Sequence, residues 1–202
     1  VIVADTWNHR VKAFSATGQQ LWQTDAIFFS PRGVAVAPNN AIFVADSGKG
    51  RIVRLSQDGV QEFMWGSIGA EPGQFQEPIG IATDMDGEVY VVDTGNSRLQ
   101  IFTQEGELRT TFPVAGWGSG AFSEPHVAVD ARRTVWVTVP LAKEVRAYRR
   151  DGTLLKTITS SKERRVFFET PMGIAYDPGR DQVVITDLAN SVFRISAQVD
   201  TP

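Results

Sequence analysis

The sequence contains no cysteine among its 202 residues, which excludes disulfide bonds, thiolate metal sites and cysteine nucleophiles. Only two histidines are present, His9 and His126. No apolar run approaches the roughly 18 residues needed to cross a bilayer, and no signal segment opens the chain. We therefore expect a soluble chain without a cofactor. Because the run from Val1 to Asp5 already has the character of a strand interior, we also expect the natural protein to be longer.

A repeat of about 47 residues runs through the chain. A hydrophobic pair followed by an acid recurs at 3–5, 44–46 and 91–93, with a looser copy at 185–187, and a glycine follows each of the first three acids by 13 residues. Prolines also mark the units, each with a phenylalanine three residues earlier: Pro31, Pro78, Pro125 and Pro171. The period predicts one structural module that is repeated along the chain.

The third unit shows the module most clearly. Runs rich in β-branched and aromatic residues at 80–83, 89–92, 98–102 and 107–112 predict four strands. Short turns rich in Gly, Asp and Asn separate them, so the strands must form an antiparallel meander. A sheet of this size cannot bury both faces alone, which predicts an all-β propeller of four-stranded antiparallel blades.

The repeat predicts a single propeller domain over 1–202, with about four and a half blades and 18 strands arranged as 3, 4, 4, 4 and 3. The expected blades are 1–29 (partial), 30–76, 77–123, 124–169 and 170–202 (partial). We expect small residues such as Gly33 and Gly80 on the innermost strands, where blades converge.

Two signature segments, Asp5–Val11 and Asp93–Leu99, resemble the Asn-His-Leu (NHL) repeat, and 65–82 resembles the linker and first strand of bacterial NHL proteins. The resemblance implies a six-bladed ring and an extracytoplasmic domain of a larger, membrane-attached protein. The fourth unit departs from the signature, because Val139 replaces the acid and 140–144 lacks Asn and Arg. The signature turn is not predicted there.

The acid and the arginine of each signature turn lie five residues apart. We interpret these turns as structural, with each carboxylate bonding turn amides and the guanidinium, because a catalytic group is needed once whereas this one repeats. The residues of this turn motif are Asp5, Asn8, Arg10, Asp46, Arg51, Asp93, Asn96 and Arg98.

The meander places the signature turns and the long connectors 65–77 and 113–124 on one face, here called the top face. This face is where we expect a protein or small ligand to bind. His126 is expected at the start of an innermost strand, facing the channel, although a structural role is favoured for it. The candidate partner-binding residues are Trp65, Trp117, His126, Lys143, Lys162, Arg164 and Arg165. Packing against a neighbouring blade is the favoured alternative for the two tryptophans.

Positive charge gathers in the segment 131–168, which carries ten cations and three acids, against an overall charge of -3. Some animal NHL propellers bind RNA through a basic top face, so the resemblance raises RNA binding by this basic blade. However, the cations are divided between the two faces, which favours a solvated surface over nucleic-acid binding.

The leading hypothesis is a non-catalytic interaction or scaffold propeller. The alternative is a propeller enzyme, a lyase or hydrolase. Amidating lyases on NHL-like propellers hold zinc with several channel histidines, and His126 with His9 cannot supply three ligands to one ion. Metal ligands for such an enzyme would have to come from further blades, and we expect no metal site in this sequence.

Overall fold

The computed structural model describes residues 1–118, 124–160, 167–189 and 191–199, and these residues form five antiparallel sheets. Each sheet is one blade. Blade one contains β1 (Ile2–Asp5), β2 (Arg10–Phe14) and β3 (Gln20–Gln23). Blade two contains β4 (Pro31–Val36), β5 (Ile42–Asp46), β6 (Arg51–Leu55) and β7 (Gln61–Trp65). Blade three contains β8 (Pro78–Thr83), β9 (Val89–Asp93), β10 (Arg98–Phe102) and β11 (Leu108–Pro113).

The remaining two blades follow in chain order. Blade four contains β12 (Val127–Val129), β13 (Val135–Val139), β14 (Glu144–Tyr148) and β15 (Leu154–Thr159). Blade five contains β16 (Pro171–Asp177), β17 (Gln182–Asp187) and β18 (Ser191–Ser196). Strand order within every sheet follows chain order. The all-β propeller fold predicted from the repeat is confirmed, with the expected strand pattern of 3, 4, 4, 4 and 3.

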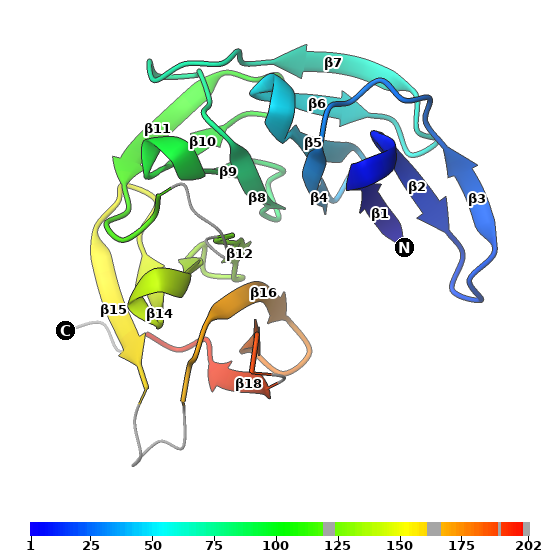
Figure 1. Cartoon of the computed structure of the whole chain (residues 1–202). Coiled ribbons are helices and arrows are strands. Elements are labelled where there is room, and N and C mark those ends of the chain that lie inside the picture. The colour runs from blue at the N-terminus through cyan, green and yellow to red at the C-terminus, as the bar shows by residue number, and fades with distance from the viewer. Residues whose placement is uncertain (119–123, 161–166, 190, 200–202) are drawn as a thin grey trace.

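The blades follow one another around an arc (Figure 1), with β4, β8, β12 and β16 innermost and β3, β7, β11 and β15 outermost. Glycine on the innermost strands allows the blades to converge. A Cβ built on Gly33 would lie 2.2 Å from the carbonyl oxygen of Ile79 in the next blade, and one on Gly80 would lie 2.9 Å from the Cα of His126. The inner strands therefore line the centre of the arc, here called the central channel.

Hydrophobic clusters fill the spaces between successive blades. One cluster joins β9 and β10, including Tyr90 and Leu99, to Val135, Val137 and Tyr148 of blade four. Because both faces of a central blade are covered in this way, every residue of β9 and of β13 is buried. The core is thus a series of interfaces between blades.

The signature turns contain short 3-10 helices that the strand pattern did not predict. They are η1 (Thr6–Asn8), η2 (Ser47–Lys49), η3 (Thr94–Asn96) and η4 (Pro140–Ala142). Each ends at a residue in the left-handed region, with φ between 52° and 57°. The fourth turn forms without the Asp, Asn and Arg of the signature, because Pro140 at the start of η4 sets the backbone for it.

Hydroxyl groups link the inner edges at three of the four junctions between the described blades. The Oγ1 of Thr6 donates to the carbonyl oxygen of Pro31 at 2.7 Å, and the Oγ of Ser47 donates to the carbonyl oxygen of Pro78. The Oγ1 of Thr138 donates to the carbonyl oxygen of Met172 at 2.9 Å. In each pair the acceptor belongs to the next blade along the chain.

Candidate binding site at the channel mouth

The acids of the second and third signature turns are hydrogen-bonding centres. The carboxylate of Asp46 accepts the backbone N–H of Phe29 at 2.6 Å and the Nε of Arg51 at 2.8 Å. Asp93 accepts the N–H of Gln76 at 2.7 Å and the Nε of Arg98 at 2.8 Å. These two acids therefore bind the incoming connector to the turn. Each also pairs with the arginine five residues later, as the sequence predicted.

The first signature turn is built differently. Asp5 accepts a 2.8 Å hydrogen bond from Asn8 and pairs with the Nζ of Lys12 at 2.6 Å, while the Nε of Arg10 donates to the carbonyl oxygen of Asn8. The expected contact between Asp5 and Arg10 is not made. Lys12 lies two residues further along the same strand face and reaches the carboxylate first. The Lys12 and Asn8 hydrogen bonds lower the pKa of Asp5.

Of the two tryptophans proposed as partner-binding residues, Trp117 is buried and Trp65 is half-buried. Trp117 is only 6% exposed, and its indole N–H donates to the carbonyl oxygen of Thr138 at 2.8 Å. Trp65 ends β7 and packs against Phe43, Phe63 and Phe102. Both side chains pack between blades, as the alternative expected for them, and Trp65 keeps part of its surface exposed.

Five described cations of the basic blade form ion pairs, four of them with carboxylates outside the segment 131–168. Among its described cations, Arg132 pairs with Asp181, Arg133 with Asp86, Arg150 with Glu88, Lys143 with Glu169 and Arg146 with Glu144. Lys162, Arg164 and Arg165 lie outside the described residues. Much of the positive charge of the basic blade is therefore already paired with carboxylates of this chain.

A pocket of about 230 Å³ lies at the top mouth of the central channel, lined by residues that three blades and η1 contribute. Arg32, Ile79 and His126 each follow the proline that opens an innermost strand, so the repeat itself places them around one opening. Glu124, from the connector into blade four, forms an ion pair with Arg32 across the opening. Thr6 and Trp7 complete the lining.

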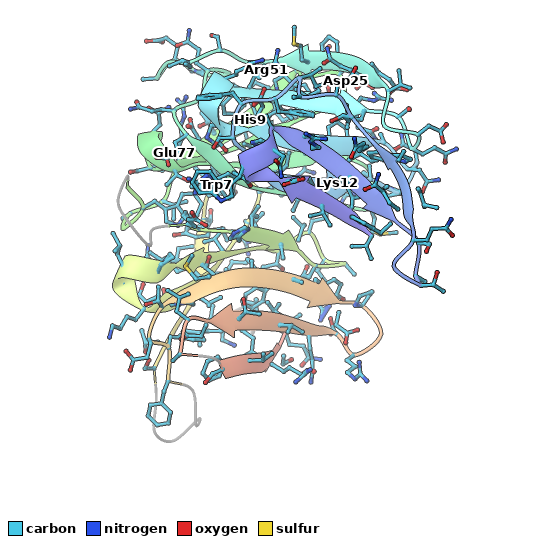
Figure 2. The ribbon with its side chains drawn as sticks, turned by 45° about the vertical axis from the view of Figure 1, so that its right-hand side comes forward. Trp7, His9, Lys12, Asp25, Arg51 and Glu77 are labelled. Carbon is cyan, nitrogen blue, oxygen red and sulfur yellow. The ribbon has the colours of Figure 1, made fainter. Side chains whose placement is uncertain are left out.

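Trp7 was not identified as a candidate from the sequence. Its side chain is 90% exposed, and Figure 2 shows it on blade one, on the side that faces the centre of the arc. The signal was present, because the same position of the second and third turns holds Gly48 and Gly95. An indole that replaces glycine and stays in solvent is a candidate contact for a ligand.

His126 faces this mouth from the first residues of blade four. Its backbone N–H donates to the Oγ1 of Thr138 at 2.9 Å. Burial lowers the pKa of the imidazole, although the nearby Glu124 opposes this effect. The ring is therefore neutral at pH 7 and can accept or donate a hydrogen bond. Within the described residues, no group of three or more His, Asp or Glu is arranged to hold a metal ion.

The NHL-repeat family model matches residues 28–55 and 75–102. These two segments are NHL repeats, and the chain is a β-propeller that carries them, called the NHL propeller below. Virginiamycin B lyase from Staphylococcus aureus is similar in structure to this NHL propeller, with a TM-score of 0.68 and 10% identity over 100% of this chain and 67% of the lyase. The NHL propeller thus spans about two thirds of the lyase's length. No curated protein sequence matches it.

Two further solved structures share the propeller. A catalytically inactive histidine-to-alanine variant of the same lyase, with quinupristin, gives a TM-score of 0.65 and 11% identity over 100% of this chain and 70% of that one. Hydrazine synthase from Kuenenia stuttgartiensis gives a TM-score of 0.71 and 14% identity over 92% of this chain and 51% of that one. At these identities the likeness shows the fold alone. Among the residues that the structure describes, no helix has the length and apolar character of a membrane span.

Proposed function

We propose that this NHL propeller is a non-catalytic binding domain that receives a protein or small ligand on its top face, at the channel mouth. The observation that carries the proposal is Trp7, a large aromatic side chain left 90% exposed at the rim of a polar pocket. Aromatic side chains of this kind supply most of the contact energy at protein interfaces.

The other residues of the mouth provide complementary contacts. Arg32 and Glu124 remain about one third and two fifths exposed, with side-chain values of 32% and 43%. The guanidinium has five N–H groups and the carboxylate has several lone pairs, so each keeps hydrogen-bonding capacity beyond their mutual pair. Ile79 adds an apolar floor. The mouth therefore suits an occupant with an aromatic or planar group beside polar atoms.

Site-specific photo-crosslinking tests this function. Benzoylphenylalanine in place of Trp7 should yield a defined crosslinked product in extracts of the native host, whereas the same probe in place of Leu154 should not. Leu154 is 52% exposed on the outermost strand of blade four and serves as the matched control. The product, once purified, should bind the unmodified chain and bind Arg32→Ala more weakly. Identical products from both positions would contradict the proposal.

A lyase or hydrolase activity is the second candidate, and His126 favours it. A half-buried imidazole that is neutral at pH 7 and faces a pocket beside a carboxylate can act as a general base. Quinupristin, which is bound to the inactive lyase variant, is a direct probe. Turnover by the chain, measured by mass spectrometry and lost in His126→Ala, would establish enzymatic activity. Intact quinupristin after prolonged incubation would count against this lyase reaction.

RNA binding through the basic blade has less support. Five of its cations are already paired with carboxylates of this chain. A phosphate backbone would have to compete with those partners, which removes much of the electrostatic gain that non-specific RNA binding requires.

A further inference from the structure

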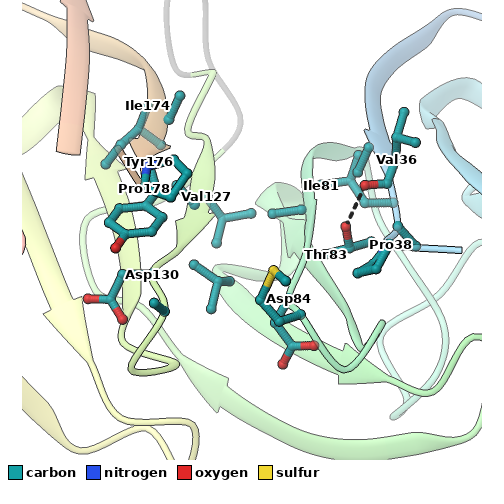
Figure 3. Close-up of a pocket in the computed structure, with 18 residues that line it drawn as sticks. Val36, Pro38, Ile81, Thr83, Asp84, Val127, Asp130, Ile174, Tyr176 and Pro178 are labelled. Carbon is teal, nitrogen blue, oxygen red and sulfur yellow. Dashed lines mark hydrogen bonds between the residues drawn. The ribbon is translucent and has the colours of Figure 1, made fainter. Parts of the chain in front are cut away.

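A second cavity lies at the opposite end of the central channel from the mouth. Its volume is about 690 Å³, and the innermost strands of blades two to five line it together with the lower turns that follow them. Figure 3 shows Val36 and Ile81 facing Val127, Ile174 and Tyr176 across this space. We call it the lower chamber. None of its lining residues belongs to the channel mouth.

The lining is mostly aliphatic. Small side chains of the repeat, such as Ala35, Ala82 and Ala175, leave the space open, and Val36 and Met85 stand at its rim with 48% and 77% of their surfaces exposed. A cavity of this size and apolar character matches those that bind small organic molecules. Its lining favours an apolar ligand, because burying apolar surface away from water is favourable in free energy.

The polar side chains of the lower chamber already have partners. The Oγ1 of Thr83 donates to the carbonyl oxygen of Val36 at 3.0 Å, as Figure 3 shows. Asp84 accepts the phenol of Tyr90 and the amides of Asp86 and Glu88. These bonds hold both groups within the protein's own turns.

The other polar lining groups are held in the same way. Asp130 accepts the indole N–H of Trp136 at 3.0 Å together with the amides of Arg132 and Thr134. The phenol of Tyr176 donates to Asp181 at 2.9 Å. Asp84 and Asp130 are buried and each already accepts three hydrogen bonds, so neither carboxylate is free to bind a cation, and an anion would be repelled by both.

We infer that the lower chamber is a binding site for a small, uncharged, apolar molecule. The site is independent of the proposed function at the channel mouth, since it shares no residue with it. Its chemistry follows from the apolar lining and from the polar groups that the protein's own hydrogen bonds already engage.

Two fluorescent probes with the same ring system test the inference on the 202-residue chain. N-phenyl-1-naphthylamine is uncharged, whereas 8-anilino-1-naphthalenesulfonate carries one negative charge. The uncharged probe should bind saturably at one site, and the sulfonate should bind about tenfold more weakly because it enters beside two carboxylates. Equal affinity for the two probes, or an uncharged probe that does not saturate, would overturn the assignment.

Substitutions locate the probe. Ala175 is exposed on β16 and lines the chamber, so Ala175→Phe should weaken the uncharged probe about tenfold by filling the space. Thr157→Phe adds the same ring at an exposed position of β15 and should leave binding unchanged.

Val36→Asp, at the rim in another blade, should weaken the uncharged probe as well by adding a carboxylate. Circular dichroism and thermal melting establish that each variant is folded. Unchanged binding in Ala175→Phe and in Val36→Asp, or an equal loss in Thr157→Phe, would show that the probe binds elsewhere.

Discussion

Individual residues of the repeat take different roles although they occupy equivalent positions. The residue after the opening proline is Arg32 in blade two, Ile79 in blade three and His126 in blade four. The shared backbone brings all three to the channel mouth, while the side chains differ in charge and polarity. Variation at a fixed position therefore sets the chemistry of the mouth without changing the fold.

The titration of His126 should be visible in the stability of the protein. Burial lowers the pKa of its imidazole in the folded chain, where Glu124 and Arg32 are the neighbouring charged groups of the mouth. As the pH falls below 6.5, the ordinary pKa of a histidine and the value expected for His126 in the unfolded chain, the unfolded chain takes up a proton before the folded chain does. The contribution of His126 to the free energy of unfolding should therefore be complete above that pH and should fall as the solution becomes more acidic.

Urea unfolding of the wild type and of His126→Gln at a series of pH values checks this prediction. The difference in unfolding free energy between the two proteins should be constant above pH 7.5. Toward pH 5.5 the wild type should lose stability relative to the glutamine variant. A difference that is independent of pH would contradict it, because the imidazole would then have the same pKa in both states.

At the scale of secondary structure, close approach of the inner strands is the tightest constraint on the sequence. Gly33→Ala should destabilise the protein by about 3 kcal/mol, because the new Cβ meets backbone rather than a movable side chain. The nearest atom is the Ile79 carbonyl oxygen at 2.2 Å. Chemical unfolding measures the effect, and Gly118→Ala is the control, since a Cβ there has no atom within 4 Å. Similar losses in both variants would argue against the convergence of the blades.

The strands could be predicted from the sequence, because alternating β-branched residues and glycine-rich turns act locally. In blade three the expected strand 98–102 coincides with β10. The signature turn of blade four could not be predicted from the motif, since its backbone depends on Pro140 and on the left-handed Lys143 rather than on the acid. The motif describes one way to stabilise the turn, and the backbone can form it in another.

The candidate site was predicted only in part, for a physical reason. His126 was placed by its repeat position, but Trp7 required knowledge of which turn residues stay exposed, and the mutual approach of Arg32 and Glu124 spans 92 residues of sequence. The packing of Trp65 and Trp117 was predicted only as the alternative to partner binding, since an aromatic residue of a connector packs inward only when a neighbouring blade offers apolar surface. Such contacts arise from tertiary packing.

For the whole molecule, stability should be greatest in the middle of the arc. Blade three is covered on both sides, and every residue of β9 is buried. The strands β3 and β18 expose half or more of their residues. In a repeat architecture each unit gains most of its stability from its neighbours. Local unfolding should therefore begin in the two terminal blades, one and five.

Hydrogen exchange followed by mass spectrometry checks this order. Peptides that cover β9 and β13 should exchange most slowly, and those that cover β3 and β18 most rapidly. Uniform exchange across all five blades would instead indicate a single cooperative unit, in which no blade opens separately.

The hydroxyl links at the inner edge give the arc a direction. Thr6, Ser47 and Thr138 each donate to a carbonyl of the blade that follows, so every such junction is head-to-tail and never symmetric. A copy of blade two would offer the Ser47 donor on one side and the Pro31 carbonyl acceptor on the other. The propeller can thus lengthen by copying such a module, because the copy already carries the groups that both of its neighbours require.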